Sequence, residues 1–234
     1  KDGRKLIRCP AGYSGAIKLP SGVTEIGEYA FDNCSLVTSI KLNRSVRKID
    51  NWAFAWCTNL TSITIPQLTK TVGNYAFKNC VNLAKVEFNF ADGKGVTKIG
   101  NYAFEFCSSL SEVILPDSLK TIGTYAFANC GSLKQIQLPQ NITKISSGTF
   151  RNSGLESIDL PTNAEFTNIP FNAFGFCNNL KTVYIPANIK TVGSHAFSWC
   201  DNLYLVTFAT TETVFASTSF SRTSKAVDIS FAVD

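Results

Sequence analysis

IGEYAFDNC, residues 26–34, is a short segment that the chain repeats with small changes. Later copies read IDNWAFAWC at 49–57, VGNYAFKNC at 72–80, IGNYAFEFC at 99–107, IGTYAFANC at 122–130 and VGSHAFSWC at 192–200. The central phenylalanine occurs at equivalent positions Phe31, Phe54, Phe77, Phe104, Phe127, Phe150, Phe174, Phe197 and Phe220. The intervals between them are 23, 23, 27, 23, 23, 24, 23 and 23 residues. A nearly fixed period of this length is typical of a protein built from stacked structural repeats.

An apolar segment with a period of two follows the cysteine in each repeat. Such alternation among β-branched residues predicts a short strand. We expect ten of these strands, at Ile17–Leu19, Ile40–Leu42, Ile63–Ile65, Val86–Phe88, Val113–Leu115, Ile136–Leu138, Ile158–Leu160, Val183–Ile185, Val206–Phe208 and Ile229–Phe231. We also expect a second, shorter extended piece at the Ile–Gly element. The Ala–Phe–x–x–Cys part is too short for a regular helix and predicts tight turns.

One repeat alone buries too little apolar surface to offset the entropy lost when its residues become ordered. Stacked repeats share their apolar faces and pair their strands. The sequence therefore predicts a predominantly β repeat solenoid with about nine 23-residue repeats, about ten short parallel strands and few or no regular helices. We expect one domain over residues 1–234, with 1–22 as a capping segment or partial repeat and 209–234 as a degenerate last repeat. Because the chain contains no methionine, we expect a processed product or a fragment.

The cysteines follow the repeat, since seven of the eight come three residues after a repeat phenylalanine. This spacing predicts a column of free, buried thiols at one corner of the stack. Stacked strands lie ~4.8 Å apart, and parallel side chains in register do not reach the ~3.8 Å Cβ separation of a disulfide. Cys9 lies two residues before its expected position, so we expect it at an edge, where it could react.

Composition argues against several classes of function. The chain has 44% apolar residues, enough for a core, but no apolar run near the ~20 residues of a membrane span. Its net charge of +5 is spread over the repeats, which is not typical of a nucleic-acid binder. A zinc site needs clustered ligands, and the sequence has no CxxC pair. A catalytic triad needs a histidine, and the single histidine, His195, takes a position that tyrosine or tryptophan fills in other repeats. We therefore expect no metal, no cofactor and no enzymatic activity.

The residues that point outward from the predicted strands are the candidate binding residues. They change from repeat to repeat while the core positions stay alike, which suits a recognition surface on a constant scaffold. The partner-binding candidates are Lys41, Thr64, Glu87, Glu112, Gln137, Asp159 and Tyr184. The alternative interpretation is an ordinary solvated sheet face.

Two further rows have more than one interpretation. Aromatic residues precede the alanines at Tyr29, Trp52, Tyr75, Tyr102 and Tyr125, and others precede cysteines at Trp56, Phe106, Phe176 and Trp199. They either pack on one another along the stack or bind sugars and protein partners. Lysines precede the Ile–Gly element at Lys48, Lys70, Lys98, Lys120, Lys144 and Lys190. They form either a solvated face or a surface for acidic partners.

The pattern L-x-x-I-x-I/L-P followed by I-G-x-x-A-F-x-x-C resembles the BspA-like, Treponema-type leucine-rich repeat, over residues from about 6 to 231. That resemblance implies a right-handed superhelix in a cell-surface or secreted protein of a host-associated microbe. It implies protein-protein binding, such as adhesion to host matrix or cells, rather than catalysis. Two alternatives are a structural spacer within a larger surface protein and a carbohydrate-binding module.

Overall fold

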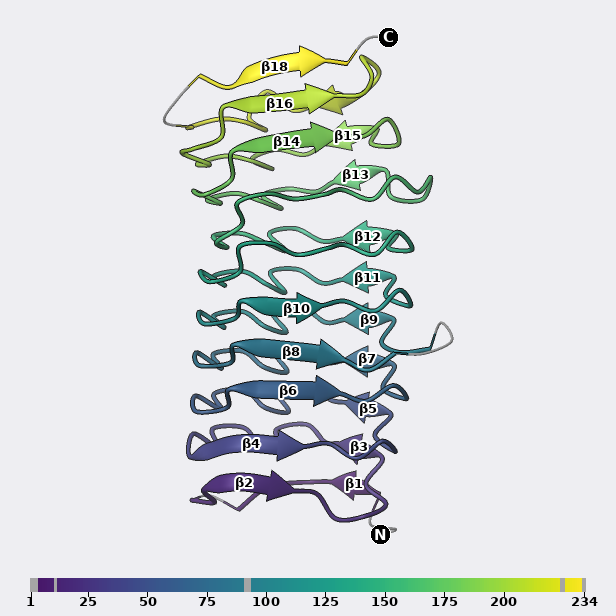
Figure 1. Ribbon diagram of the computed structural model, residues 1–234, viewed down its shortest axis with the longest axis vertical. Helices are drawn as coiled ribbons and strands as arrows, with labels where there is room; N and C mark the ends of the chain where they lie inside the picture. Colours follow the sequence, from purple (N-terminus) through teal and green to yellow (C-terminus); the bar gives the residue numbers. More distant parts are fainter. Residues whose placement is uncertain (1–3, 11, 91–93, 224–225, 233–234) are drawn as a thin grey trace.

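Long parallel strands stack above one another toward both ends of the molecule, with loops in their place in between (Figure 1). The computed structural model describes residues 4–10, 12–90, 94–223 and 226–232. The long strands are β2 Gly15–Lys18, β4 Val37–Lys41, β6 Ser62–Ile65, β8 Lys85–Phe88, β10 Glu112–Ile114, β14 Thr182–Ile185, β16 Leu205–Phe208 and β18 Asp228–Phe231. From β2 to β10 and again from β14 to β18, each long strand lies one repeat after the previous one, so one repeat forms one coil of a solenoid.

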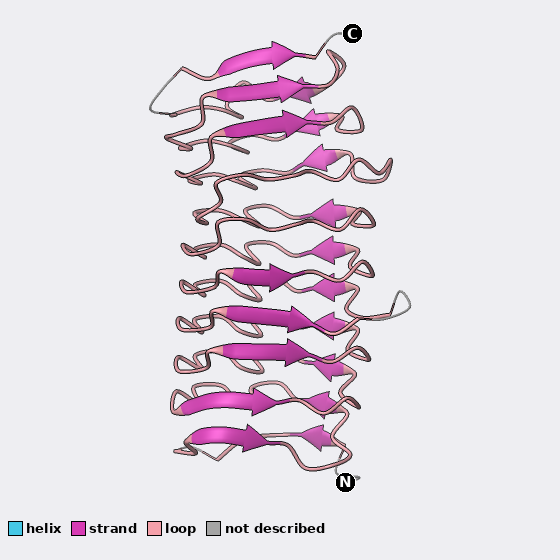
Figure 2. Ribbon diagram, in the orientation of Figure 1, coloured by secondary structure: helices cyan, strands magenta, loops and turns pink. Residues whose placement is uncertain are grey.

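A short strand at the Ile–Gly element runs back across each coil, as the sequence predicts. These strands are β1 Lys5–Leu6, β3 Glu25–Ile26, β5 Lys48–Ile49, β7 Thr71–Val72, β9 Lys98–Ile99, β11 Thr121–Ile122, β12 Lys144–Ile145, β13 Asn168–Ile169, β15 Thr191–Val192 and β17 Val214–Phe215. Those from β1 to β12 form one seven-stranded sheet, and β13, β15 and β17 form another. Strands and turns make up all of the described chain, with no helix (Figure 2). The predicted β solenoid is confirmed.

The phenylalanines form the central column of the core. Consecutive rings from Phe31 to Phe220 stack face to face with centroids 4.9–5.7 Å apart. Their planes differ by no more than 10°. Phe54 and Phe104 are completely buried. Each ring inside the column therefore contacts a phenylalanine ring on both of its faces instead of water. This arrangement requires successive coils to have the same shape.

The turns that carry these phenylalanines also bind successive coils together. The N–H groups of Tyr75, Phe77 and Asn79 donate to carbonyls of the next coil at 2.8, 2.7 and 2.9 Å. Tyr75 and Asn79 have φ angles of 57° and 60°, in the left-handed region that side chains other than glycine rarely adopt. This backbone conformation points alternate N–H groups toward the next coil. The hydrogen bonds that these groups form offset the free-energy cost of the strained φ angles.

All eight cysteines are free and buried; for the seven repeat cysteines this confirms the predicted thiol column, whereas Cys9, expected at an edge where it could react, is buried as well. The Cys57 thiol donates to the Phe31 carbonyl of the preceding coil at 3.1 Å. Burial raises the pKa of the Cys80 thiol from 9.0 to about 12, so it stays protonated at neutral pH. Cys9 lies at the end of the column next to Cys34, and burial followed by this neighbour raises the pKa of Cys34 to about 11.

Two predicted strands do not form, and this corrects the sequence analysis. Ile136–Leu138 and Ile158–Leu160 make only a single bridge, between Gln137 and Asp159. In the turn between them Leu155 follows Phe150 by five positions, whereas Leu133 follows Phe127 by six positions in the preceding coil. Equivalent positions of these two coils are therefore 22 residues apart, and only Gln137 and Asp159 keep a bridge across them.

A larger core residue accompanies the break in the short-strand sheet between β12 and β13. Phe166 is completely buried where other coils have the smaller Ile142 and Ile189. A side chain bridges the missing ladder, since the Asn163 amide donates to the Ile142 carbonyl at 2.8 Å. Beyond the break, where β13 and β15 pair, the Asn188 amide donates to the Phe166 carbonyl at 2.7 Å. The stack therefore stays continuous although its sheets do not.

Candidate functional site

The predicted partner-binding residues all lie exposed or half-buried on the long-strand side of the coils. We call this surface the strand face. It comprises the outward-pointing residues of the long strands, together with Gln137 and Asp159, which take the same place in the two coils that lack a long strand. Thr64 and Glu87 are neighbours in register, and the Thr64 hydroxyl donates to the Glu87 carboxylate at 3.2 Å. Lys41 on β4 is the equivalent position one coil before Thr64, whereas Tyr184 on β14 lies farther along the stack (Figure 1).

Lys85 joins two of the predicted residues into one charged cluster. Its ammonium lies 2.8 Å from both the Glu87 and the Glu112 carboxylates. Hydrogen bonds to Glu112 and then Glu87 raise the pKa of Lys85, and the bond from Lys85 lowers the pKa of Glu87. Sequence reasoning assigned Glu112 to this face but did not anticipate a lysine shared between two acids.

A groove of about 880 Å³ opens where the strand ladder is interrupted. It is lined by β10, the edge strand of its sheet, by the segment 135–138 of the next coil, and by Ser157 and Asp159 of the coil after that. Glu112, Gln137 and Asp159 line the groove, so the structure brings three of the seven predicted residues together there. Ile114 also lines it and is 54% exposed. The charged lining residues are Glu112, which is paired with Lys85, and Asp117 and Asp159, so the lining is acidic.

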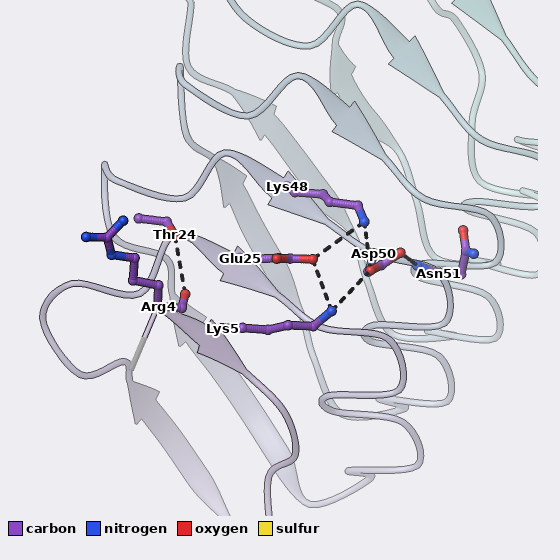
Figure 3. Close-up of polar contacts among 7 residues, drawn as sticks. All are labelled: Arg4, Lys5, Thr24, Glu25, Lys48, Asp50 and Asn51. Carbon is purple, nitrogen blue, oxygen red and sulfur yellow. Dashed lines mark hydrogen bonds and ion pairs between the residues drawn. The ribbon is translucent and has the colours of Figure 1, made fainter. Parts of the chain in front are cut away.

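Four charged side chains form a compact network on the first short strands (Figure 3). Lys48 lies 2.9 Å from Asp50 and 3.5 Å from Glu25, while Lys5 lies 3.2 Å from Glu25 and 3.8 Å from Asp50. The register of β1, β3 and β5 places Lys5, Glu25 and Lys48 side by side. Since each charge meets two of opposite sign, the network serves to hold these strands together.

This network predicts a dependence of stability on acid. Burial opposes ionisation of Asp50, but the hydrogen bonds from Lys48 and the Asn51 N–H outweigh it and lower the pKa of Asp50 below 3.8. A lowered carboxyl pKa stabilises the fold above the ordinary value, and that stabilisation disappears as the pH falls through the folded value. Asp50→Asn keeps the acceptor for Asn51 but removes the charge. We expect urea unfolding of the variant to change less between pH 6 and pH 3 than wild type, by up to about 1 kcal/mol because the lysines are half-exposed. Equal pH dependence would contradict this role.

The single histidine does not form a catalytic device. His195 Nδ1 lies 3.0 Å from the Ser198 hydroxyl, but that hydroxyl donates to the Thr218 carbonyl at 3.0 Å. Ser198 is also 1% exposed, so a substrate could not reach its oxygen. Among the described residues, no group of three or more His, Cys, Asp and Glu side chains could hold a metal ion.

The aromatic row packs along the stack, as one of its two interpretations predicts. Tyr29, Trp52, Tyr75, Tyr102 and Tyr125 stack with successive centroids 6.1, 4.1, 4.8 and 5.4 Å apart. The lysines of the neighbouring row at 70, 98, 120, 144 and 190 are exposed, which fits both of their interpretations.

The comparisons with known proteins agree with this geometry. The family model for the BspA type leucine rich repeat region matches residues 14–94 and 97–227, with six copies. This family is typically non-enzymatic. No curated protein sequence matches significantly. Over the described residues, no helix has the length and apolar character needed to cross a bilayer.

Solved structures show the same architecture. A leucine-rich repeat protein from Bacteroides ovatus is 32% identical with a TM-score of 0.80 over 92% of this chain, which spans 55% of that protein. The T. pallidum leucine rich repeat protein is 30% identical with a TM-score of 0.62, covering 80% of this chain and 77% of its own. The pneumococcal vaccine antigen PcpA, 20% identical with a TM-score of 0.53 over 97% of this chain and 71% of its own, shares the fold. The chain thus belongs to the BspA-type leucine-rich repeat family.

Proposed function

We propose that residues 1–234 act as one non-enzymatic binding domain of a secreted or cell-surface protein, which attaches to host matrix or cells through its strand face. The observation that carries this proposal is the acidic groove between β10 and segment 135–138. It is the place where the regular face is hollowed and where three variable positions converge. A scaffold of constant core and variable surface supports recognition rather than chemistry.

The walls of the groove suit an extended segment of a protein partner. As an edge strand, β10 presents backbone N–H and C=O groups with which a partner strand can pair. Exposed Ile114 offers apolar contact at the same place. The acidic groups at Glu112, Asp117 and Asp159 favour a segment that carries lysine or arginine.

A purely structural spacer explains these features less well. A spacer needs only the continuous core, whereas an exposed apolar residue and an open sheet edge promote association and are usually covered. Catalysis is also disfavoured, because no histidine lines the groove and the carboxylates that line it are exposed rather than held in a buried cleft.

The test is a binding assay with a panel of purified extracellular-matrix proteins and intact host cells. The double charge reversal Glu112→Lys and Asp159→Lys turns the groove basic at two exposed positions. We expect it to weaken binding at least about tenfold, because it replaces attraction with repulsion at the proposed site.

Lys41→Glu is the matched control, since it reverses one exposed charge on the same face but outside the groove. We expect it to bind within about twofold of wild type. Absence of binding to every matrix protein and cell type would refute adhesion. Binding that survives the double reversal would refute the groove as its site.

A further inference from the structure

A second hollow, of about 440 Å³, lies away from the strand face, where the turns of the first two coils meet. Tyr29, Asp32, Asn33, Trp52 and Trp56 line it. They all belong to the turns that connect a short strand to the next long strand. Tyr29 is 43% exposed and Trp56 is 47% exposed, so the aromatic surface is open to solvent although the aromatic row itself is stacked.

Comparison with later coils shows why this hollow exists. The residue before the cysteine in each turn occupies one column, and there Phe176 stacks on Trp199 at 5.6 Å with planes 13° apart. Arg151 and Arg222 cover the outer faces of those two rings, at 4.4 and 5.2 Å from their centroids. That aromatic pair is therefore covered on both sides by guanidinium groups.

At Trp56 the same column offers no such cover. Its neighbours in the preceding and following coils are Asn33 and Asn79, whose side chains are much smaller than a ring. The Asn33 N–H donates to the Ala55 carbonyl at 2.8 Å, which fixes the two turns side by side. The space that Phe176 fills beside Trp199 is thus left open beside Trp56, next to Tyr29 and Trp52. An occupant of that space should be a flat ring about the size of an aromatic side chain.

The rim of the hollow carries groups that bind hydroxyls. Burial raises the pKa of Asp32, while the charge of Arg8 opposes this shift. The Asp32 carboxylate accepts hydrogen bonds, and the Asn33 amide both donates and accepts them. An aromatic surface with a few converging polar groups is the usual composition of a small-molecule site.

We propose that Trp56, Tyr29, Trp52, Asp32 and Asn33 form a saccharide-binding site that takes one pyranose unit of a glycan. The C–H face of the sugar ring lies against the indole of Trp56, since polarised C–H bonds are attracted to the negative face of an aromatic ring. The hydroxyls at the edge of the sugar bond to Asp32 and Asn33. A cationic ligand fits less well, because Arg8 offsets the charge of Asp32. The site is independent of the groove on the strand face.

Isothermal titration calorimetry of the whole chain with two probes tests this site. Cellotetraose represents glucose polymers, and N-acetyllactosamine represents galactose-containing glycans of animal cells; choline chloride is the cationic comparison. We expect binding of at least one saccharide and none of choline, and the stronger saccharide identifies the source of the glycan. Binding of choline alone, or of no probe, would overturn the proposal.

Trp56→Asn places at this position the residue that Asn33, Asn79 and Asn129 provide in other coils, and asparagine tolerates the φ of 59°. We expect it to lower saccharide affinity at least tenfold. Trp199→Asn makes the same change where Phe176 and Arg222 cover the ring, and should leave affinity unchanged. Asp32→Asn, which keeps the shape of the rim, should weaken binding several-fold. Equal losses of saccharide affinity in the two tryptophan variants, or undiminished affinity in Trp56→Asn, would contradict the site. This outcome does not depend on how the Glu112→Lys and Asp159→Lys variant binds matrix proteins or cells.

Discussion

Phe104→Ala is expected to lower the free energy of unfolding by about 3–5 kcal/mol, the usual cost of truncating a buried phenylalanine. Phe104 is completely buried, with ring centroids of Phe77 and Phe127 at 5.1 and 5.2 Å on its two sides. The hydrogen bonds between coils, such as Phe104 N–H to the Ala126 carbonyl at 2.8 Å, hold the backbone in place. The coils cannot collapse into the cavity without breaking these bonds. Urea unfolding followed by circular dichroism measures the change.

Phe106→Ala is the control because it removes the same ring two residues away. Phe106 is 42% exposed, and its nearest described cation is Lys78, 6.0 Å from the ring centroid. We expect a loss of about 1 kcal/mol or less, as for most surface positions. Similar losses for the two variants would mean that the phenylalanine column does not dominate the core.

Removing one whole coil is expected to leave a folded protein. Deletion of residues 100–122 joins Ile99 to Gly123 and creates IGTYAFANC after β9, which restores the repeat. Phe77 then faces Phe127, and β9 pairs with β12 in place of β11. Because each coil contacts only its neighbours, stability should fall moderately while the β spectrum persists. Circular dichroism and thermal unfolding measure both quantities.

A partial deletion has the opposite expected outcome, and it gives the largest effect of any change considered. Removal of residues 100–111 alone takes away the turn with Phe104, Cys107 and Leu110 but leaves β10. The chain then cannot return to the start of the next coil, so every later column loses its register. We expect an unfolded or aggregated product by circular dichroism and size-exclusion chromatography. A folded partial deletion, or an unfolded whole-coil deletion, would be incompatible with a stack of equivalent coils.

The repeat period of the sequence predicts the core residues well, because every core position is subject to the same packing constraint. Each residue at a core position must match the residue one coil away, so identity recurs where packing decides it. Phe31, Cys34 and Ile40 are buried as expected, and so are their equivalents in most coils. The second strand at the Ile–Gly element follows from the same regularity.

The left-handed turns could not be predicted from the aromatic row. Tyrosine and tryptophan rarely adopt a positive φ, yet Tyr29 and Trp52 have values of 58° and 57°. A weaker signal lay in the column before the cysteines, where Asn33, Asn79 and Asn129 recur, because asparagine favours this conformation. The strain is tolerated only because the next coil accepts the N–H groups, which no local pattern reveals.

Both candidate sites lie where a coil departs from the repeat pattern. The structural effect of such a departure cannot be predicted from the pattern itself. The sequence places Glu112, Gln137 and Asp159 on one face, but the groove between them arises from a missing ladder. The short turn after Phe150 is visible in the sequence, whereas the lost pairing beside β10 is not, because the turns of the two coils that meet there have equal length. The hollow beside Trp56 likewise arises from the small size of Asn33, a contrast that only alignment of the coils makes plain.

The central claim is that equivalent side chains of successive coils touch, and a double-mutant cycle tests it most directly. Phe54 and Phe77 are 4.9 Å apart between ring centroids, whereas Phe54 and Phe127 belong to coils three repeats apart. For Phe54→Leu combined with Phe77→Leu, we predict a coupling free energy of at least about 0.5 kcal/mol in urea unfolding. For Phe54→Leu combined with Phe127→Leu, the single effects should add within about 0.5 kcal/mol. Additive effects in the adjacent pair, or coupling of equal size in the distant pair, would contradict the stacked column.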